Sequence, residues 1–126
     1  MMEINNLTKF KIDRKSFAQV AKKVLKGENK GTQNISLAFV DKTEMQKLNK
    51  KFRKKDKPTD VLSFSFDEKD FLGEIVICPE VVKKKKENIK KVFVHGILHL
   101  LGYDHKKSKT EEIKMQNKEK FYFNEG

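Results

Sequence analysis

The chain has 126 residues, a length that suits one domain with a single hydrophobic core. A hydrophobic fraction of 37% and ten Phe residues argue against intrinsic disorder, and a charged fraction of 37% predicts a strongly solvated surface. The net charge of +11 favours a nucleic acid or an anionic membrane as partner, although a general enrichment in lysine accounts for it equally well. We therefore expect residues 1–126 to form one domain.

The composition also indicates the cellular compartment in which the protein is expected. Cys78 is the single cysteine, so no intrachain disulfide is possible and a reducing environment is expected. The N-terminus lacks the apolar segment of a signal peptide, and no stretch approaches the roughly 18 apolar residues of a membrane span. These features predict a soluble cytoplasmic protein in which Cys78 is a small buried hydrophobe.

The N-terminal third of the chain predicts a strand, a helix and a second strand. Residues 4–7 favour a short strand. Apolar residues then recur at helical spacing after Asp13 or Ser16, either of which can be the N-cap, and Gly27 ends this amphipathic helix. The apolar run over residues 35–40 has the length of a strand.

The middle of the chain predicts a helix followed by a basic loop. Asp41 or Thr43 can cap the helix, whose apolar face ends near Arg53. Residues 54–60 form the loop, which ends in Lys-Pro-Thr-Asp.

Two strands and a long helix come next. Residues 61–66 and 72–77 flank a turn at 67–70 and predict an antiparallel pair. Pro79 then begins one helix that is basic at residues 83–86 and apolar nearly all round from Ile89 to Leu101. The basic run is expected to be a solvated face, and the apolar half is expected to be buried.

The C-terminal segment predicts a turn and a last helix. Gly102 is placed to end the preceding helix in a left-handed conformation. Ser108 to Glu111 has the capping-box pattern and begins a helix toward Phe121. The order β-α-β-α-β-β-α-α predicts an α+β fold with a mixed sheet of about four strands packed against helices.

All three histidines of the chain lie within eleven residues. His95 and His99 are spaced i and i+4, so both imidazoles can reach one metal ion from the same helix face. Gly102 lets the chain turn back, which brings His105 within reach as a third ligand. Alone, each histidine would be an ordinary core or surface residue, whereas the combination predicts a metal site on the buried helix and the following turn.

The ligand set indicates zinc, with one ion per chain. Three nitrogen ligands suit Zn²⁺ better than Mg²⁺ or Ca²⁺, and they leave a fourth position open for water or substrate, as in catalytic sites. The spacing is also similar to the metzincin pattern His-Glu-x-x-His-x-x-Gly-x-x-His, but Gly96 stands where that pattern has the glutamate base. A zinc peptidase is therefore the less favoured alternative.

Three segments together resemble the YbeY family of bacterial endoribonucleases. They are the histidine segment 95–105, Lys57-Pro-Thr-Asp-Val-Leu-Ser-Phe64 and Gly73-Glu-Ile-Val-Ile-Cys-Pro-Glu80. The resemblance spans most of the chain and implies a small metal-dependent hydrolase fold. One departure is Ser65, where relatives commonly have proline; it alters a strand residue and leaves the site intact.

The resemblance also implies a function. It points to a cytoplasmic, zinc-dependent, single-strand-specific endoribonuclease that matures the 3′ end of small-subunit ribosomal RNA and takes part in ribosome quality control. Precursor rRNA, the small ribosomal subunit and an assembly GTPase are the partners implied. The alternative within the same family setting is a ribosome-assembly factor that binds RNA and whose metal is structural.

The family's site residues fall on particular positions of this chain. By resemblance, its metal ligands are His95, His99 and His105, and its functional arginine is Arg53. A guanidinium can grip a phosphate with two parallel hydrogen bonds, although at a helix end it is otherwise an ordinary solvated cation.

Four further residues are weaker candidates. Lys54, Lys55 and Lys57 are candidates for RNA-backbone contact, with diffuse surface charge as the alternative. Asp104 can orient a ligand imidazole or simply form the turn.

Overall fold

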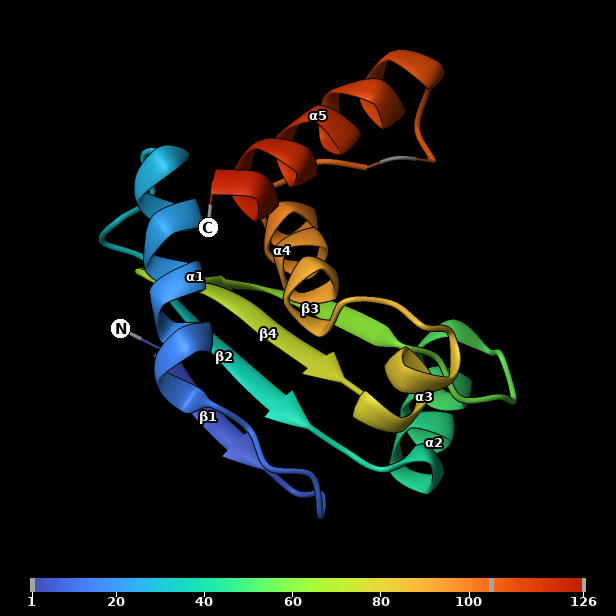
Figure 1. The fold of residues 1–126 in the computed structure, drawn as a ribbon. Helices are drawn as coiled ribbons and strands as arrows, with labels where there is room; N and C mark the ends of the chain where they lie inside the picture. The colour runs from blue at the N-terminus through green and yellow to red at the C-terminus, as the bar shows by residue number, and fades with distance from the viewer. Residues whose placement is uncertain (1, 105, 126) are drawn as a thin grey trace.

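The computed structural model describes residues 2–104 and 106–125, and Figure 1 shows their arrangement. The elements, in chain order, are β1 (Met2–Asn6), α1 (Arg14–Gly27), β2 (Asn34–Phe39), α2 (Lys42–Arg53), β3 (Val61–Glu68), β4 (Phe71–Ile77), α3 (Pro79–Lys84), α4 (Ile89–Leu100) and α5 (Lys109–Glu125). The α+β class is confirmed. No helix within these residues is long and apolar enough to cross a bilayer.

The sheet has four strands in the order β1-β2-β4-β3. The pairs β1–β2 and β2–β4 are parallel, whereas β3 is antiparallel to β4, as the sequence predicts for these two strands. The sheet is therefore mixed, and β3 is one of its edge strands. A register shift between Ser65 and Glu68 marks a β-bulge in β3.

Side chains that alternate along the strands separate two cores. Ile35, Leu37 and Ile75 belong to the larger core, which α1 and α4 cover from one face of the sheet (Figure 1). Val76 and Cys78 belong to the smaller core, which also contains Met45 of α2. Cys78 is fully buried and free, as expected of a small hydrophobe.

Local chemistry fixes most helix ends where the sequence predicts them. The side chain of Asp13 accepts a hydrogen bond from the Ser16 N–H, and that of Asp41 accepts one from the Glu44 N–H. The hydroxyl of Ser108 accepts one from the Glu111 N–H at 3.1 Å, which begins α5. These caps supply acceptors for N–H groups that have no partner inside the helix.

The end of α4 is a Schellman motif. Gly102 has φ of +101°, its N–H donates to the His99 carbonyl, and the Tyr103 N–H donates to the Leu98 carbonyl. The chain therefore turns sharply directly after the helix that carries the histidines.

The prediction of one continuous helix from Pro79 to Leu101 is wrong. The chain breaks between α3 and α4, where Lys86 takes a left-handed conformation with φ of 58°. Asn88 then caps α4, since its side chain accepts hydrogen bonds from the Lys90 and Lys91 N–H groups. The break separates a short basic helix from the apolar helix that enters the core.

Candidate functional site

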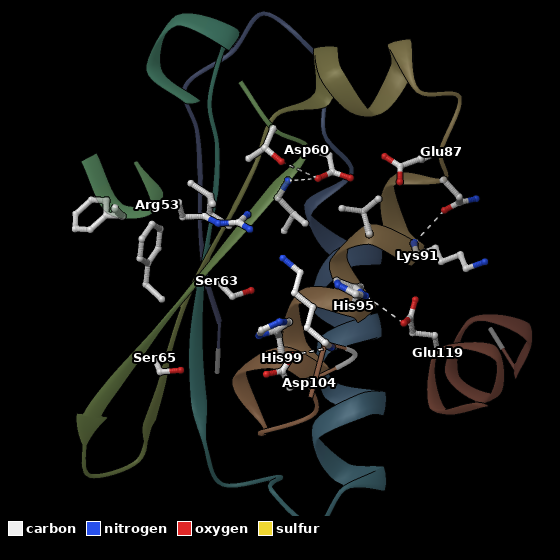
Figure 2. Close-up of a pocket in the computed structure, with 18 of the residues that line it drawn as sticks. Arg53, Asp60, Ser63, Ser65, Glu87, Lys91, His95, His99, Asp104 and Glu119 are labelled. Atoms are coloured by element: carbon white, nitrogen blue, oxygen red, sulfur yellow. Dashed lines mark hydrogen bonds and ion pairs between the residues drawn. The ribbon is translucent and has the colours of Figure 1, made fainter. Parts of the chain in front are cut away.

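A cleft of about 1160 Å³ runs between the edge strand β3 and helix α4. Residues from several elements line it (Figure 2): Arg53 at the end of α2, Asp60, six consecutive positions of β3 from Val61 to Phe66, Glu87 before α4, then Lys91, His95 and His99 of α4, Asp104, and Glu119 of α5. Four predicted site residues from separate parts of the chain, Arg53, His95, His99 and Asp104, therefore line one cleft.

The helix spacing brings His95 and His99 together as predicted. Their ring centroids are 5.9 Å apart, and both side chains line the cleft (Figure 2). The His95 side chain is 27% exposed, so it is partly shielded by protein yet accessible from the cleft.

Glu119 of α5 lies directly against His95. The distance between His95 Nδ1 and Glu119 Oε2 is 3.1 Å, and the carboxylate is only 15% exposed. Histidines that bind metals commonly donate their second ring N–H to a carboxylate, which fixes the tautomer and leaves Nε2 for the ion. The His95–Glu119 pair therefore suits a metal ligand, and the sequence analysis missed Glu119.

The third predicted ligand, His105, lies outside the described residues. Among residues 2–104 and 106–125, no group of three His, Cys, Asp or Glu side chains is placed to hold a metal ion. Asp104 lines the cleft, and its carboxylate accepts a hydrogen bond from the Lys106 N–H at 3.0 Å. This contact is that of a turn-forming aspartate, and the orienting role predicted as an alternative stays a prediction.

Gly96 holds α4 close to the sheet. A Cβ atom at this position would lie 2.9 Å from Ile75 Cγ2 and 3.3 Å from Ser63 Oγ. The Ser63 hydroxyl in turn donates a hydrogen bond to the Gly96 carbonyl at 3.2 Å. The position where metzincins have their glutamate therefore faces the strands, with no room for a side chain.

Arg53 reaches the cleft, whereas the predicted lysines lie beside it. Figure 2 shows Arg53 extending from α2 toward the space that the two histidines face. Lys54 ends α2 in a left-handed conformation, and the Lys57 carbonyl accepts a hydrogen bond from the buried Asn49 side chain at 2.8 Å. The hydrogen bond from Asn49 therefore holds the basic loop, residues 54–60, against α2, at whose end Arg53 lies.

Cations of the loop and the histidine turn crowd together. The charge of Arg53 is the main cause that lowers the pKa of Lys55, and the charges of Lys106 and Lys57 contribute. Cations that converge despite their repulsion are typical of a surface that receives a polyanion.

Two carboxyl groups, Asp60 and Glu87, influence each other's pKa at another part of the cleft. Partial burial, a hydrogen bond with Asp60 and the charge of Asp60 raise the pKa of Glu87 to about 7. Burial alone would raise the pKa of Asp60, but the hydrogen bond with Glu87, the charge of Lys85 and the Val61 N–H lower it. Asp60 is therefore the ionised member of the pair, and the pKa of Glu87 lies close to neutral pH.

Glu28 connects the histidine turn to α1 and α5. Its carboxylate accepts one hydrogen bond from the Tyr103 hydroxyl at 2.7 Å and another from the Tyr122 hydroxyl, and it forms an ion pair with Lys118 at 3.1 Å. Burial would raise the pKa of Glu28, but these hydrogen bonds and the charge of Lys118 lower it. Desolvation and the bond to Glu28 raise the pKa of Tyr103 to about 12, so the phenol stays a donor.

Fold and cleft together define a class of protein: a small α+β domain with a histidine pair on a buried helix, facing an arginine across the edge strand of a mixed sheet. The family model described as Endoribonuclease YbeY matches residues 3–126. The chain belongs to this family.

Individual relatives agree with the family match. The chain is 43% identical over 102 residues to Endoribonuclease YbeY of Bdellovibrio bacteriovorus, covering 75% of this chain and 67% of that protein. It is 41% identical over 108 residues to Endoribonuclease YbeY of Francisella philomiragia, covering 72% and 66%. The chain thus spans about two thirds of the length of these curated relatives.

A solved structure has the same fold. The solution structure of TM1509 from Thermotoga maritima is similar with a TM-score of 0.67 and 32% sequence identity, over 99% of this chain and 91% of that one.

Proposed function

We propose that this protein is a zinc-dependent endoribonuclease that cleaves single-stranded RNA in the cleft between β3 and α4. The observation that carries the proposal is the His95–His99 pair with Glu119 behind it, facing Arg53 across the cleft. The endoribonuclease name of the relatives and the net charge of +11 support an RNA substrate.

His95, His99 and His105 would hold the zinc ion. A zinc ion bound there would supply Lewis-acid polarisation of a phosphate oxygen. Glu119 would keep His95 in the tautomer that presents Nε2 to the ion, since its carboxylate would accept a hydrogen bond from the Nδ1–H group. The nitrogen donors and the acidic partner fit zinc better than a hard, oxygen-seeking cation.

Arg53 would stabilise the scissile phosphate. Its planar guanidinium can donate two parallel hydrogen bonds to phosphate oxygens and can offset the charge that develops during cleavage. Lys55, which lies near the charges of both Arg53 and Lys106, and Lys106 itself would attract the flanking RNA backbone. Peptide hydrolysis is disfavoured, because Gly96 offers no base and no room for one.

The substrate we propose is the precursor of small-subunit ribosomal RNA, cut near its 3′ end, with a further part in ribosome quality control. The small subunit and an assembly GTPase are the proposed partners, by family resemblance, and the cytoplasm is the proposed location.

Metal analysis and RNA cleavage test the proposal together. The purified protein should contain about one zinc per chain, and His95→Ala, His99→Ala and His105→Ala should each lower that content sharply. Metal-loaded protein should cut single-stranded RNA but neither casein nor a DNA strand of the same sequence, and chelation should abolish cleavage.

A His99→Ala preparation, purified in parallel, controls for contaminating ribonuclease. Full zinc occupancy in all three histidine variants would refute the ligand assignment. RNA cleavage by His99→Ala at the wild-type rate would refute the assignment of the nuclease activity to this site.

A further inference from the structure

Exposed aromatic rings gather along the β3 side of the cleft. Phe52 is 55% exposed and Phe66 is 47% exposed, and both line the cleft that contains the histidines. Each ring leaves about half of its surface in water, where burial would be favourable. A cleft that keeps them exposed is suited to a ligand with flat apolar faces.

Neighbouring rings hold these two phenylalanines in place. Phe52 meets Phe64 edge to face with centroids 5.0 Å apart, and Phe66 meets Phe71 in the same way at 5.3 Å. An edge-to-face contact fixes the orientation of a ring while part of its surface stays uncovered.

The backbone of β3 directs Phe66 as well. The β-bulge between Ser65 and Glu68 contains Phe66 and lies on an edge strand. Bulges at sheet edges re-aim side chains and often adjoin active sites. The exposed ring is thus associated with a local irregularity of the strand beside the cleft.

The charge distribution around the rings selects one kind of ligand. Arg53 directly follows Phe52 and lines the same cleft, as does Lys106, and the charges of both act on Lys55. Figure 2 shows Glu87 and Glu119 on the other side of the cleft from Arg53, Ser63 and Ser65. The Asp60 carboxylate, at the start of β3, forms an ion pair with Lys85 at 3.7 Å. Flat apolar surface next to cations matches a strand of unpaired nucleotides, which offers bases and phosphates in alternation.

From this arrangement we infer that Phe52 and Phe66 are stacking sites for unpaired bases of the RNA, and that they determine the preference for single strands. The inference rests on the proposed function. Duplex RNA keeps its bases stacked on each other and cannot offer their faces to these rings. Phosphate contacts alone do not distinguish the two forms in this way.

Binding of two probes separates stacking from charge. The first probe is a fluorescein-labelled, single-stranded 2′-O-methyl dodecamer, checked for integrity on a denaturing gel, and the second is a base-free spacer strand with the same number of phosphates. Phe52→Ala and Phe66→Ala should each weaken binding of the dodecamer roughly 5- to 100-fold. Binding of the base-free strand should change less than about twofold, and the salt dependence should be unchanged.

Further variants distinguish an aromatic requirement from an apolar one. Phe66→Tyr should bind as wild type does, whereas Phe66→Leu should lose affinity. Phe121 supplies a matched control, because it is 57% exposed on α5 and does not line the cleft; Phe121→Ala should bind normally. Circular dichroism and thermal melting of each variant show that it is folded.

Each outcome supports or overturns the inference. Equal losses for both probes, full affinity in Phe66→Leu, or an equal loss in Phe121→Ala would overturn base stacking and favour a general apolar surface, such as one for a protein partner. Wild-type binding by Phe52→Ala and Phe66→Ala, in a protein that still cleaves RNA, overturns stacking and leaves the proposed function intact. A wild-type protein that binds neither probe and cuts no RNA overturns both.

Discussion

Replacing Glu28 with alanine removes one carboxylate that three side chains share. Tyr103 and Tyr122 would lose the acceptor of their hydroxyls, and Lys118 would lose its ion pair. The Glu28 side chain is only 10% exposed and Tyr122 is 4% exposed, so water replaces these contacts poorly. The variant should therefore be markedly less stable than wild type.

The expected loss follows from the three contacts. Hydrogen bonds to charged groups contribute about 1.5–3 kcal/mol each, and contacts to one shared group are not additive. The Lys118 side chain is 39% exposed, so its ion pair adds less than about 1 kcal/mol. Together these give a loss of about 3–5 kcal/mol and a fall in Tm of roughly 10–20 °C for a domain of this size.

Urea unfolding followed by circular dichroism measures the loss. Glu80→Ala is the matched control, because its carboxylate is 53% exposed and its ion pair with Lys42 spans 4.0 Å; it should cost under about 1 kcal/mol. Since Tyr103 precedes the predicted third ligand by two residues, Glu28→Ala should also weaken zinc binding. A loss no greater than that of Glu80→Ala would refute the reasoning.

The same group predicts an acid dependence. The pKa of Glu28 is lowered in the folded protein, so its stabilisation is present above the ordinary value of 4.5 and is lost as pH falls through the folded pKa. Glu28→Gln should flatten the acid side of the stability curve, and an unchanged acid side would contradict this assignment.

Three further outcomes are expected. Because the pKa of Glu87 is raised to about 7, its contribution to stability is complete below pH 4.5 and is lost as pH rises through 7. Glu87→Gln should therefore reduce the fall in Tm between pH 5 and pH 8. A fall identical to that of wild type would contradict the raised pKa of Glu87. Gly102→Ala should cost about 1–2 kcal/mol in urea unfolding from backbone strain alone, since φ is +101° and a Cβ there meets nothing within 4 Å. Arg53→Ala should keep zinc but lose RNA cleavage, and Arg53→Lys should keep only part of the cleavage activity. Cleavage by Arg53→Ala at the wild-type rate would make the residue an ordinary helix-end cation. Lys47→Ala, a change at an exposed position of α2, is the control.

The fold was predictable where local chemistry decides it. Asp13, Asp41 and Ser108 each cap the helix that follows, and apolar residues at helical spacing after Asp13 and Asp41 predict the first two of these helices. The antiparallel β3–β4 pair follows from two segments of strand length, the first of them alternating, on either side of a short turn. The strand order was not accessible, because parallel pairing depends on contacts between distant segments.

The break between α3 and α4 illustrates a second limit. Lys83 to Lys86 are good helix formers, so no residue type in the run signals an end. The left-handed conformation at Lys86 departs from that intrinsic preference. Asn88 carried the one available signal, as a side chain suited to cap the apolar helix after it.

The residues of the candidate site were likewise predictable only where local spacing places them. The i, i+4 spacing on one helix suffices to bring His95 and His99 together. Glu119 is 24 residues from His95, and only the packing of α5 against α4 joins them. The Asp60–Glu87 pair likewise depends on where β3 begins relative to α4, which no local pattern encodes.

The contact at Gly96 also bears on how such proteins can evolve. A single-nucleotide change can convert a glycine codon to one for glutamate, so the metzincin-like sequence is within easy mutational reach. Such a variant would force a side chain against Ile75, which is fully buried in β4, and would push α4 away from the sheet. A smaller residue at Ile75 would relieve this contact, so acquiring the glutamate without loss of stability calls for at least one compensating change in β4.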